Sequence, residues 1–162
     1  YWDSVEYFKG QGIDLLGEHR AELTPQFADL LESVQGMSAI QYKMDDVVRS
    51  DVFDAVQDVF DGYDLLVTPT LAVPPVDNTS DGNTIGPTSI NGEAVDPLIG
   101  WCLTYPINFT GHPAASIPAG LTDDGLPIGM QMVARRFADD TLLAASAAFE
   151  RVRPWHHTYP PR

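Results

Sequence analysis

The residues of this chain that can act as nucleophiles, bases or metal ligands are few and scattered. The only cysteine is Cys102, the only lysines are Lys9 and Lys43, and the serines stand apart from one another. A hydroxyl or thiol is a weak nucleophile until an adjacent base activates it. Neither the lysines nor the neighbours of Cys102 form a motif that supplies such a base. We therefore assign no catalytic residue to this chain.

Metal binding and redox chemistry are also unsupported. A single cysteine excludes an internal disulfide and a cysteine-rich metal site, and a buried inert thiol is the interpretation that fits Cys102. His156 and His157 are adjacent, so their rings point in different directions and make a poor ligand pair. The sequence predicts no metal and no cofactor.

The charge balance is strongly acidic. The chain has 23 acidic and 9 basic residues, a formal net charge of −14. An acidic surface for a basic partner is one interpretation. We favour a halophilic protein, whose scattered carboxylates need concentrated salt to screen their repulsion. Phosphate contacts need clustered lysine and arginine, so we expect no binding to nucleic acid by this chain.

The expected compartment follows from what the sequence lacks. No stretch approaches the roughly 20 apolar residues of a membrane span, and no basic start precedes an apolar run. We expect no membrane association and a cytoplasmic location in a high-salt cytosol. The chain starts at Tyr1 rather than methionine, and we expect it to be a piece of a longer protein.

The spacing of apolar residues predicts three helices. Residues 25–35 follow Thr24 as a cap and have Pro25 at the first helical position. Ser38 caps a longer helix that runs to about Phe60 with its apolar residues on one face. A last helix begins at Asp139, where negative charge meets the positive end of the helix dipole, and stops before residue 154. Besides these three helices, residues 98–105 are expected to form a helical turn or a short helix.

Three short strands are expected between these helices. Residues 64–68 are an apolar run that fits a strand buried on both faces. Residues 114–118 form a second strand, and residues 128–133 alternate as a third. Asp123-Asp124-Gly125 is a turn between the last two strands. Residues 70–97 are rich in turn residues, and a loop of this length is usually functional or disordered.

Three motifs in this order make the sequence specific. They are YDLLVTPT at residues 63–70, NFTGHPAASIPAG at residues 108–120, and DGLPIGMQ at residues 124–131. Together they resemble the carboxy-terminal third of the amidase-signature family, whose members hydrolyse amides. The resemblance covers roughly residues 25–152. It implies an α/β fold, part of a mixed, largely parallel sheet flanked by helices within an αβα domain.

The resemblance also implies which part of the enzyme is missing. The family uses a serine nucleophile, a bridging serine and a lysine base, with an oxyanion hole from a glycine- and serine-rich loop. These lie upstream of the matched part, and this chain has no such loop. We expect residues 1–162 to be the carboxy-terminal portion of an amidase-signature domain without its catalytic amino-terminal portion, and to be inactive alone.

The same resemblance suggests which residues line the substrate pocket. In the family, the loop after the TPT strand and the segment before Asn108 lie near the acyl-binding side. The candidate substrate-binding residues are Thr68, Thr70, Trp101, Tyr105 and Asn108. Trp101 and Tyr105 are four residues apart, so on a helix they share one face. The alternative is that both are core aromatics.

Position 101 separates two kinds of family member. Relatives that release ammonia from glutamine for tRNA amidation tend to have aspartate here, which binds the amino group of glutamine. Trp101 instead favours an apolar or aromatic amide as the small-molecule substrate. Two alternatives to the amidase remain. One is the A-type subunit of a glutamine-dependent tRNA amidotransferase, and the other is a non-catalytic stand-alone binding module.

A sheet cut from a larger domain leaves a free strand edge and an uncovered apolar face. We therefore expect the isolated chain to form a homodimer, or to cover the strand edge and the apolar face in another way. The gene upstream of Tyr1 distinguishes enzyme from module. An in-frame lysine and a double-serine loop support the enzyme.

Overall fold

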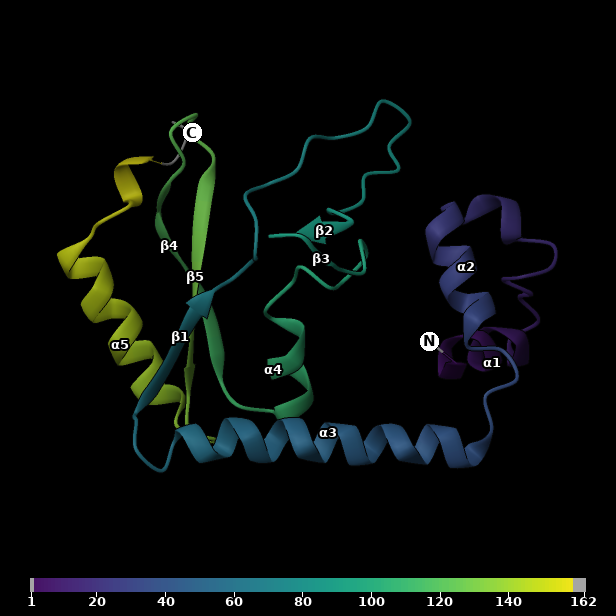
Figure 1. The fold of residues 1–162 in the computed structure, drawn as a ribbon, viewed down its shortest axis with the longest axis horizontal. Helices are drawn as coiled ribbons and strands as arrows, with labels where there is room; N and C mark the ends of the chain where they lie inside the picture. Colours follow the sequence, from purple (N-terminus) through teal and green to yellow (C-terminus); the bar gives the residue numbers. More distant parts are fainter. Residues whose placement is uncertain (1, 159–162) are drawn as a thin grey trace. The chain divides into compact units, whose positions relative to one another are not determined.

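The computed structural model describes residues 2–158, which divide into two compact units. The boundary lies at Val47–Val48, inside the long helix α3 (Ala39–Val59), so this helix begins in one unit and ends in the other (Figure 1).

The first unit is helical. It comprises α1, the short 3-10 helix η1, α2 and the start of α3, with bounds Trp2–Gly10, Arg20–Glu22 and Pro25–Ser33 for the first three. Its buried apolar side chains are Val5, Ala28 and Leu31. A small core of this kind leaves much of the unit exposed to water.

The helix starts in this unit follow the predicted signals in part. Pro25 opens α2, but Thr24 makes no side-chain capping bond. Ser38 does cap α3, since the Gln41 N–H donates to Ser38 Oγ at 3.2 Å. The Ser38 N–H donates back to Gln41 Oε1 at 2.9 Å, which completes a reciprocal capping box.

The second unit is built on a three-stranded sheet. Its strands are β1 (Leu65–Pro69), β4 (Ala114–Leu121) and β5 (Pro127–Ala134), in the order β1-β5-β4 (Figure 1). The α/β class is confirmed. Among the described residues every strand pair is antiparallel, whereas a largely parallel sheet was expected. For the β4–β5 pair the reason is local, because the turn at residues 123–125 folds β5 back on β4.

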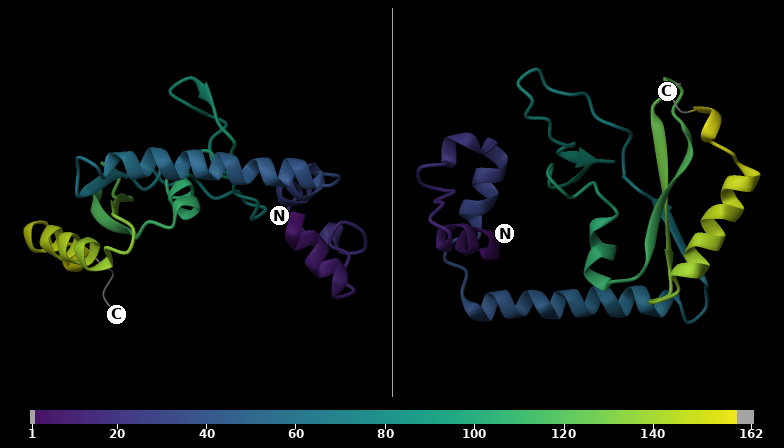
Figure 2. Two further views of the ribbon diagram at one scale, coloured as in Figure 1. Left: turned by 90° about the horizontal axis from the view of Figure 1, so that it is seen from below. Right: turned by 180° about the vertical axis from the view of Figure 1, so that it is seen from behind.

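Helices cover both faces of this sheet (Figure 2). On one face α5 (Asp139–Val152) packs its Leu142 against the strand residues Ile117 and Met132. On the other face α4 (Tyr105–Thr110) and the end of α3 contribute to a second cluster. That cluster consists of Phe60, Ile107 and Val133 with Val56 and Leu66.

Strand β1 lies at the edge of the sheet rather than inside it. Val67 is 50% exposed, so the prediction of a strand buried on both faces is wrong at this position. The cause is the strand order, which gives β1 a single neighbour, β5. An apolar run alone does not distinguish a central strand from an edge strand that another chain segment covers.

The segment expected as a loop contains a small hairpin. Strands β2 (Ser89–Ile90) and β3 (Glu93–Ala94) pair across Asn91 and Gly92. Both turn residues have positive φ, 51° and 85°, as this tight turn requires. The Asn-Gly pair is the sequence feature from which this hairpin was predictable.

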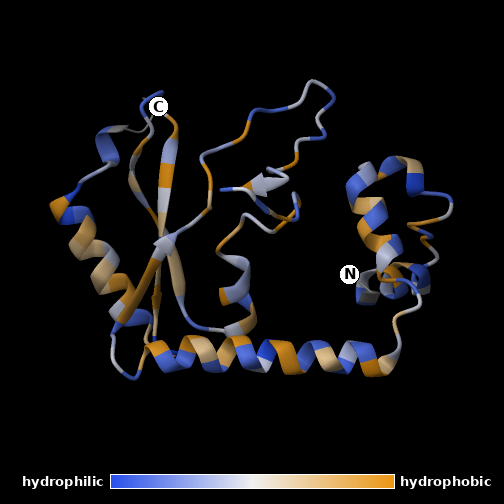
Figure 3. Cartoon of the chain, viewed as in Figure 1, coloured by the Kyte–Doolittle hydropathy of each residue, from blue (hydrophilic) through white to orange (hydrophobic). Residues whose placement is uncertain are grey.

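Hydrophobic residues recur along the long helix α3 (Figure 3). Ile40, Met44 and Val48 are 77%, 56% and 61% exposed. The predicted apolar face is present, but it is buried only toward the end of the helix, where Phe60 is fully enclosed. None of the helices within residues 2–158 combines the length and the apolar character of a membrane span.

Candidate functional site

The end of β1 is joined to the segment that precedes α4. The Leu103 N–H donates to the Thr70 carbonyl at 3.2 Å, and the Ala72 N–H donates to the Trp101 carbonyl at 2.9 Å. Leu71 and Cys102 form an antiparallel bridge between the two. Backbone pairing thus brings together two parts of the chain that both carry predicted site residues.

Gln131 on β5 adds a side-chain connection to this pairing. It is only 2% exposed, and its Nε2 donates to Thr68 Oγ1 and to the Leu103 carbonyl, both at 3.0 Å. The Gln131 side chain is therefore buried and hydrogen-bonded inside the protein rather than exposed to solvent. Both N–H bonds of the amide are satisfied, as burial requires.

A pair of hydroxyl groups lies next to Gln131 on the same face of the sheet, and one of them belongs to Thr70, two residues after Thr68. Thr70 Oγ1 and Ser116 Oγ are 2.7 Å apart, and either can donate. Beneath them the Thr70 N–H donates to the Gly129 carbonyl at 3.0 Å. A Cβ on Gly129 would lie 2.7 Å from Thr70 Oγ1, so the absence of a side chain there makes room for the pair. Sequence reasoning gave Ser116 no site role.

Trp101 has a fixed and partly buried position. Its Nε1 donates to the Pro97 carbonyl at 3.1 Å, and the same carbonyl accepts from the Gly86 N–H at 2.8 Å. The indole lies directly against Gly86, because a Cβ on that glycine would overlap the ring. Trp101 is therefore held from the loop side as well as through its own backbone.

Tyr105 and Asn108 lie on α4 with exposed side chains. The expectation that Trp101 and Tyr105 share a helical face is wrong, because Trp101 lies in a turn before the helix begins at Tyr105. Pro106 belongs to the first turn of α4, a position that suits proline at a helix start. Tyr105 stacks edge-on against Phe109 with ring centroids 5.6 Å apart.

His112 is buried at the entry to β4. It is 5% exposed and stacks on Phe60 at 5.2 Å, and its Nε2 lies 3.3 Å from Gln57 Oε1. Burial lowers the pKa of His112 below its ordinary value, and the positive charge of Arg136 lowers it further. A neutral imidazole of this kind joins α3 to the sheet.

The hydroxyl groups of this site have no base beside them among the described residues. Ser116 pairs with Thr70, while Ser33 and Ser146 donate to the carbonyls of their own helices. Lys43 is paired with Asp46 at 2.9 Å on exposed α3. Within residues 2–158, no three histidine, cysteine, aspartate or glutamate side chains gather closely enough to hold a metal ion.

Comparison with known proteins places these motifs in a family. The model of the family described as Amidase matches residues 18–143. The chain belongs to the amidase family. An acylamidase of Rhodococcus erythropolis is 33% identical over 137 residues, 84% of this chain and 28% of that protein. The A-type subunit of the glutamyl-tRNA(Gln) amidotransferase of Streptococcus agalactiae is 35% identical over 119 residues, 74% of this chain and 22% of that protein.

Solved structures agree with the sequence comparison. A bacterial aryl acylamidase of the amidase-signature family superposes with a TM-score of 0.88 at 51% identity, covering 96% of this chain. A 6-aminohexanoate cyclic dimer hydrolase superposes with a TM-score of 0.62 at 25% identity over 82% of this chain. The chain covers only 31% and 30% of those two proteins. It thus spans less than a third of the length of these relatives.

Proposed function

We propose that this chain is the carboxy-terminal portion of an amidase that hydrolyses carbon–nitrogen bonds in aromatic amides. It supplies sheet scaffold and part of the substrate pocket. The observation that carries the proposal is Trp101, whose ring donates a hydrogen bond to the Pro97 carbonyl and whose backbone pairs with the segment that follows β1. The 51% identity to an aryl acylamidase supports the aromatic substrate class.

The catalytic triad belongs, in this proposal, to the part of the enzyme outside these residues. Amide hydrolysis needs a nucleophile with an adjacent base and donors aimed at the developing oxyanion. Within the part of the chain that the structure describes, the hydroxyl pair of Thr70 and Ser116 has neither a lysine nor a histidine bonded to it. Its role is to shape the pocket wall rather than to attack the substrate.

The test is amide hydrolysis by the full-length product of the gene. We expect release of aniline from acetanilide, with weaker release of ammonia from acetamide and none from glutamine. Changing Trp101→Ala should raise KM for acetanilide on the order of tenfold, because apolar contact with the ring is lost. The matched control is Tyr7→Ala, which removes an exposed aromatic side chain that is not a candidate site residue. Full-length enzyme that leaves acetanilide intact would contradict the proposal.

The isolated chain gives a second measurement. We expect residues 1–162 to release neither aniline nor ammonia, since the nucleophile is supplied elsewhere. Clear release by purified chain would place a nucleophile within these residues and disprove the missing-triad part of the proposal.

An A-type subunit of a glutamine-dependent tRNA amidotransferase is the second candidate function. It is favoured by the 35% identity to a protein of that kind. Ammonia release from glutamine, with no aniline from acetanilide, would select it. An upstream reading frame without lysine and a double-serine loop would select a non-catalytic binding module.

We further infer that the protein works in a concentrated-salt cytosol. A net charge of −14 on 162 residues produces self-repulsion that salt screens. The melting temperature of the chain should rise as potassium chloride is added. A melting temperature that is independent of salt would remove the basis for a halophilic source.

The isolated chain should also self-associate as a homodimer. Edge strand β1 leaves hydrogen-bonding groups without a second neighbour in the described sheet, and Val67 beside them is half exposed. Light scattering coupled to size exclusion measures the mass directly. A monodisperse monomer would contradict this expectation.

A further inference from the structure

Two residues with no assigned role bear on where Trp101 lies. One is Gly86, in the loop between β1 and β2, and the other is Gln131, on β5. Gly86 touches the indole, whereas Gln131 acts on the segment that carries it. The two belong to parts of the chain that are 45 residues apart, yet both constrain the same aromatic side chain.

The contact at Gly86 is steric. A Cβ built on this glycine would meet the indole Nε1 and neighbouring ring atoms at overlapping distances. The φ angle of Gly86 lies outside the left-handed region, so alanine is compatible with the backbone itself. The indole is what leaves no space for a side chain.

The contact at Gln131 is directional. Its amide uses one N–H for Thr68 Oγ1 on β1 and the other for the carbonyl of Leu103, two residues after Trp101. Leucine in this place would fill the volume but leave the Leu103 carbonyl without its donor. The segment would then be held to β1 by backbone pairing alone.

We propose that Gly86 and Gln131 are positioning residues that fix the Trp101 indole, Gly86 by contact with the ring and Gln131 through the backbone at Leu103, and so set the preference of the site for aromatic amides. This inference rests on the proposed function. Gly86 leaves room for the ring beside the Pro97 carbonyl, and Gln131 holds the backbone at Leu103 from the sheet side. Neither residue needs to touch the substrate.

The first test is spectroscopic and needs no activity. In the full chain with Trp2→Phe and Trp155→Phe, the emission reports on Trp101. We expect Gly86→Ala and Gln131→Leu each to shift this emission to longer wavelength and to increase quenching by acrylamide, since the ring becomes more exposed. Far-UV circular dichroism checks that each variant is folded.

Matched controls exist for both substitutions. A Cβ on Gly62 meets nothing within 4 Å, so Gly62→Ala should leave the emission unchanged. Gln57 bonds to His112 away from this segment, so Gln57→Leu also removes an amide hydrogen bond but should not move Trp101. If Gly86→Ala and Gln131→Leu behave like these controls, the proposal is overturned. Should Gln131→Leu fail to fold, the emission of Gly86→Ala decides whether the proposal holds. Thr68→Val then tests the Gln131 side, because it removes one acceptor of the Gln131 amide and should shift the emission in the same direction.

The second test uses the full-length gene product. Gly86→Ala and Gln131→Leu should raise KM for acetanilide on the order of tenfold, with little change in kcat and none in either constant for acetamide. Adding Trp101→Leu to Gly86→Ala frees the space that the ring occupied, so Gly86→Ala should then have no further effect on KM. Equal loss on both substrates would mean a merely structural role and would overturn the proposal.

The two tests separate this inference from the proposed function. Wild-type enzyme that leaves acetanilide intact disproves the aromatic amidase. The emission data alone would then decide whether Gly86 and Gln131 position Trp101. An active enzyme with unchanged emission in both variants would leave the amidase intact and disprove the positioning role.

Discussion

One face of the sheet has two ends that are stabilised in different ways. Leu66 on β1 and Val133 on β5 are paired in register, and they pack against Phe60 and Ile107. Two residues along β1, Thr68 pairs instead with Gln131. Because side chains two apart in a strand share a face, an apolar end and a polar end follow each other directly.

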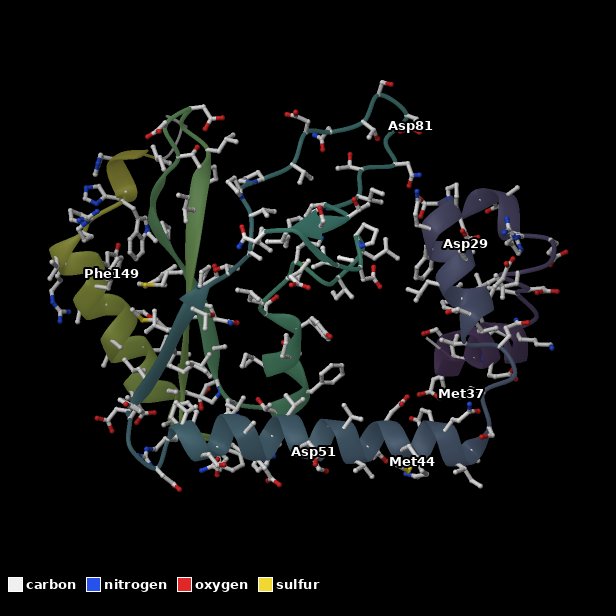
Figure 4. All side chains as sticks on the ribbon, in the orientation of Figure 1. Asp29, Met37, Met44, Asp51, Asp81 and Phe149 are labelled. Carbon is white, nitrogen blue, oxygen red and sulfur yellow. The ribbon has the colours of Figure 1, made fainter. Side chains whose placement is uncertain are left out.

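The two ends differ in what they contribute, which is stability at the apolar end and side-chain position at the polar end. The apolar end is held by burial, which tolerates small changes in angle. The polar end is held by hydrogen bonds at Thr68, Thr70, Ser116 and Gln131, which specify direction and distance. We infer that the apolar end sets the free energy of unfolding, and that the polar end sets where Trp101 lies. Figure 4 draws the side chains as sticks on the ribbon.

The largest expected effect is at the apolar end. Phe60 is fully buried, and Phe60→Ala should lower the free energy of unfolding by about 3–5 kcal/mol, since it leaves a cavity. Urea denaturation measures the loss. The control is Leu143→Ala on α5, where the side chain is 66% exposed and the expected change is within about 0.5 kcal/mol. Equal losses would mean that this cluster is not the main source of stability.

An intermediate effect is expected at the polar end. In Gly129→Ala the new methyl group would lie 2.7 Å from Thr70 Oγ1 and 2.9 Å from Ser116 Oγ. We expect a loss of about 1–3 kcal/mol from overpacking, measured by the same denaturation. Adding Ser116→Gly should recover part of the loss. If it recovers nothing, the hydroxyl pair does not limit the space above Gly129.

The smallest effect is the pH dependence that His112 gives to the apolar end. Burial holds its pKa in the folded chain below 6.5, so the unfolded chain binds the proton more readily. The contribution of this site is complete above pH 6.5 and is lost as pH falls below that value. Melting temperature measured from pH 8 to pH 5 should show the decline. His112→Phe keeps an aromatic ring between Phe53 and Phe60 and should flatten that part of the curve.

Sequence patterns predicted the elements that depend on interactions between residues close together in the chain. The strand–turn–strand at residues 114–134 and the helix at Asp139–Val152 lie close to where the pattern put them. Ser38 caps α3 as predicted, because capping involves only neighbouring residues. The Asn91–Gly92 hairpin shows that the long loop contained a further local feature that sequence analysis did not use.

The candidate site was predictable only in part. Thr68, Thr70 and Trp101 are brought together by backbone pairing, whereas Tyr105 and Asn108 are placed on α4 with exposed side chains. Their part in substrate binding stays a prediction. The helical face assumed for Trp101 and Tyr105 was wrong because spacing carries meaning only after the helix boundary is known.

The sequence by itself determined the α/β class, the order of the motifs and the family to which they belong. Tertiary structure decided which strand lies at the edge, that Gln131 reaches both Thr68 and Leu103, and that Gly86 makes room for Trp101. The physical reason is the distance along the chain over which each kind of interaction acts. Capping, turns and periodicity act between near neighbours along the chain, while strand order, amide hydrogen bonds and steric fit join residues that only folding brings into contact.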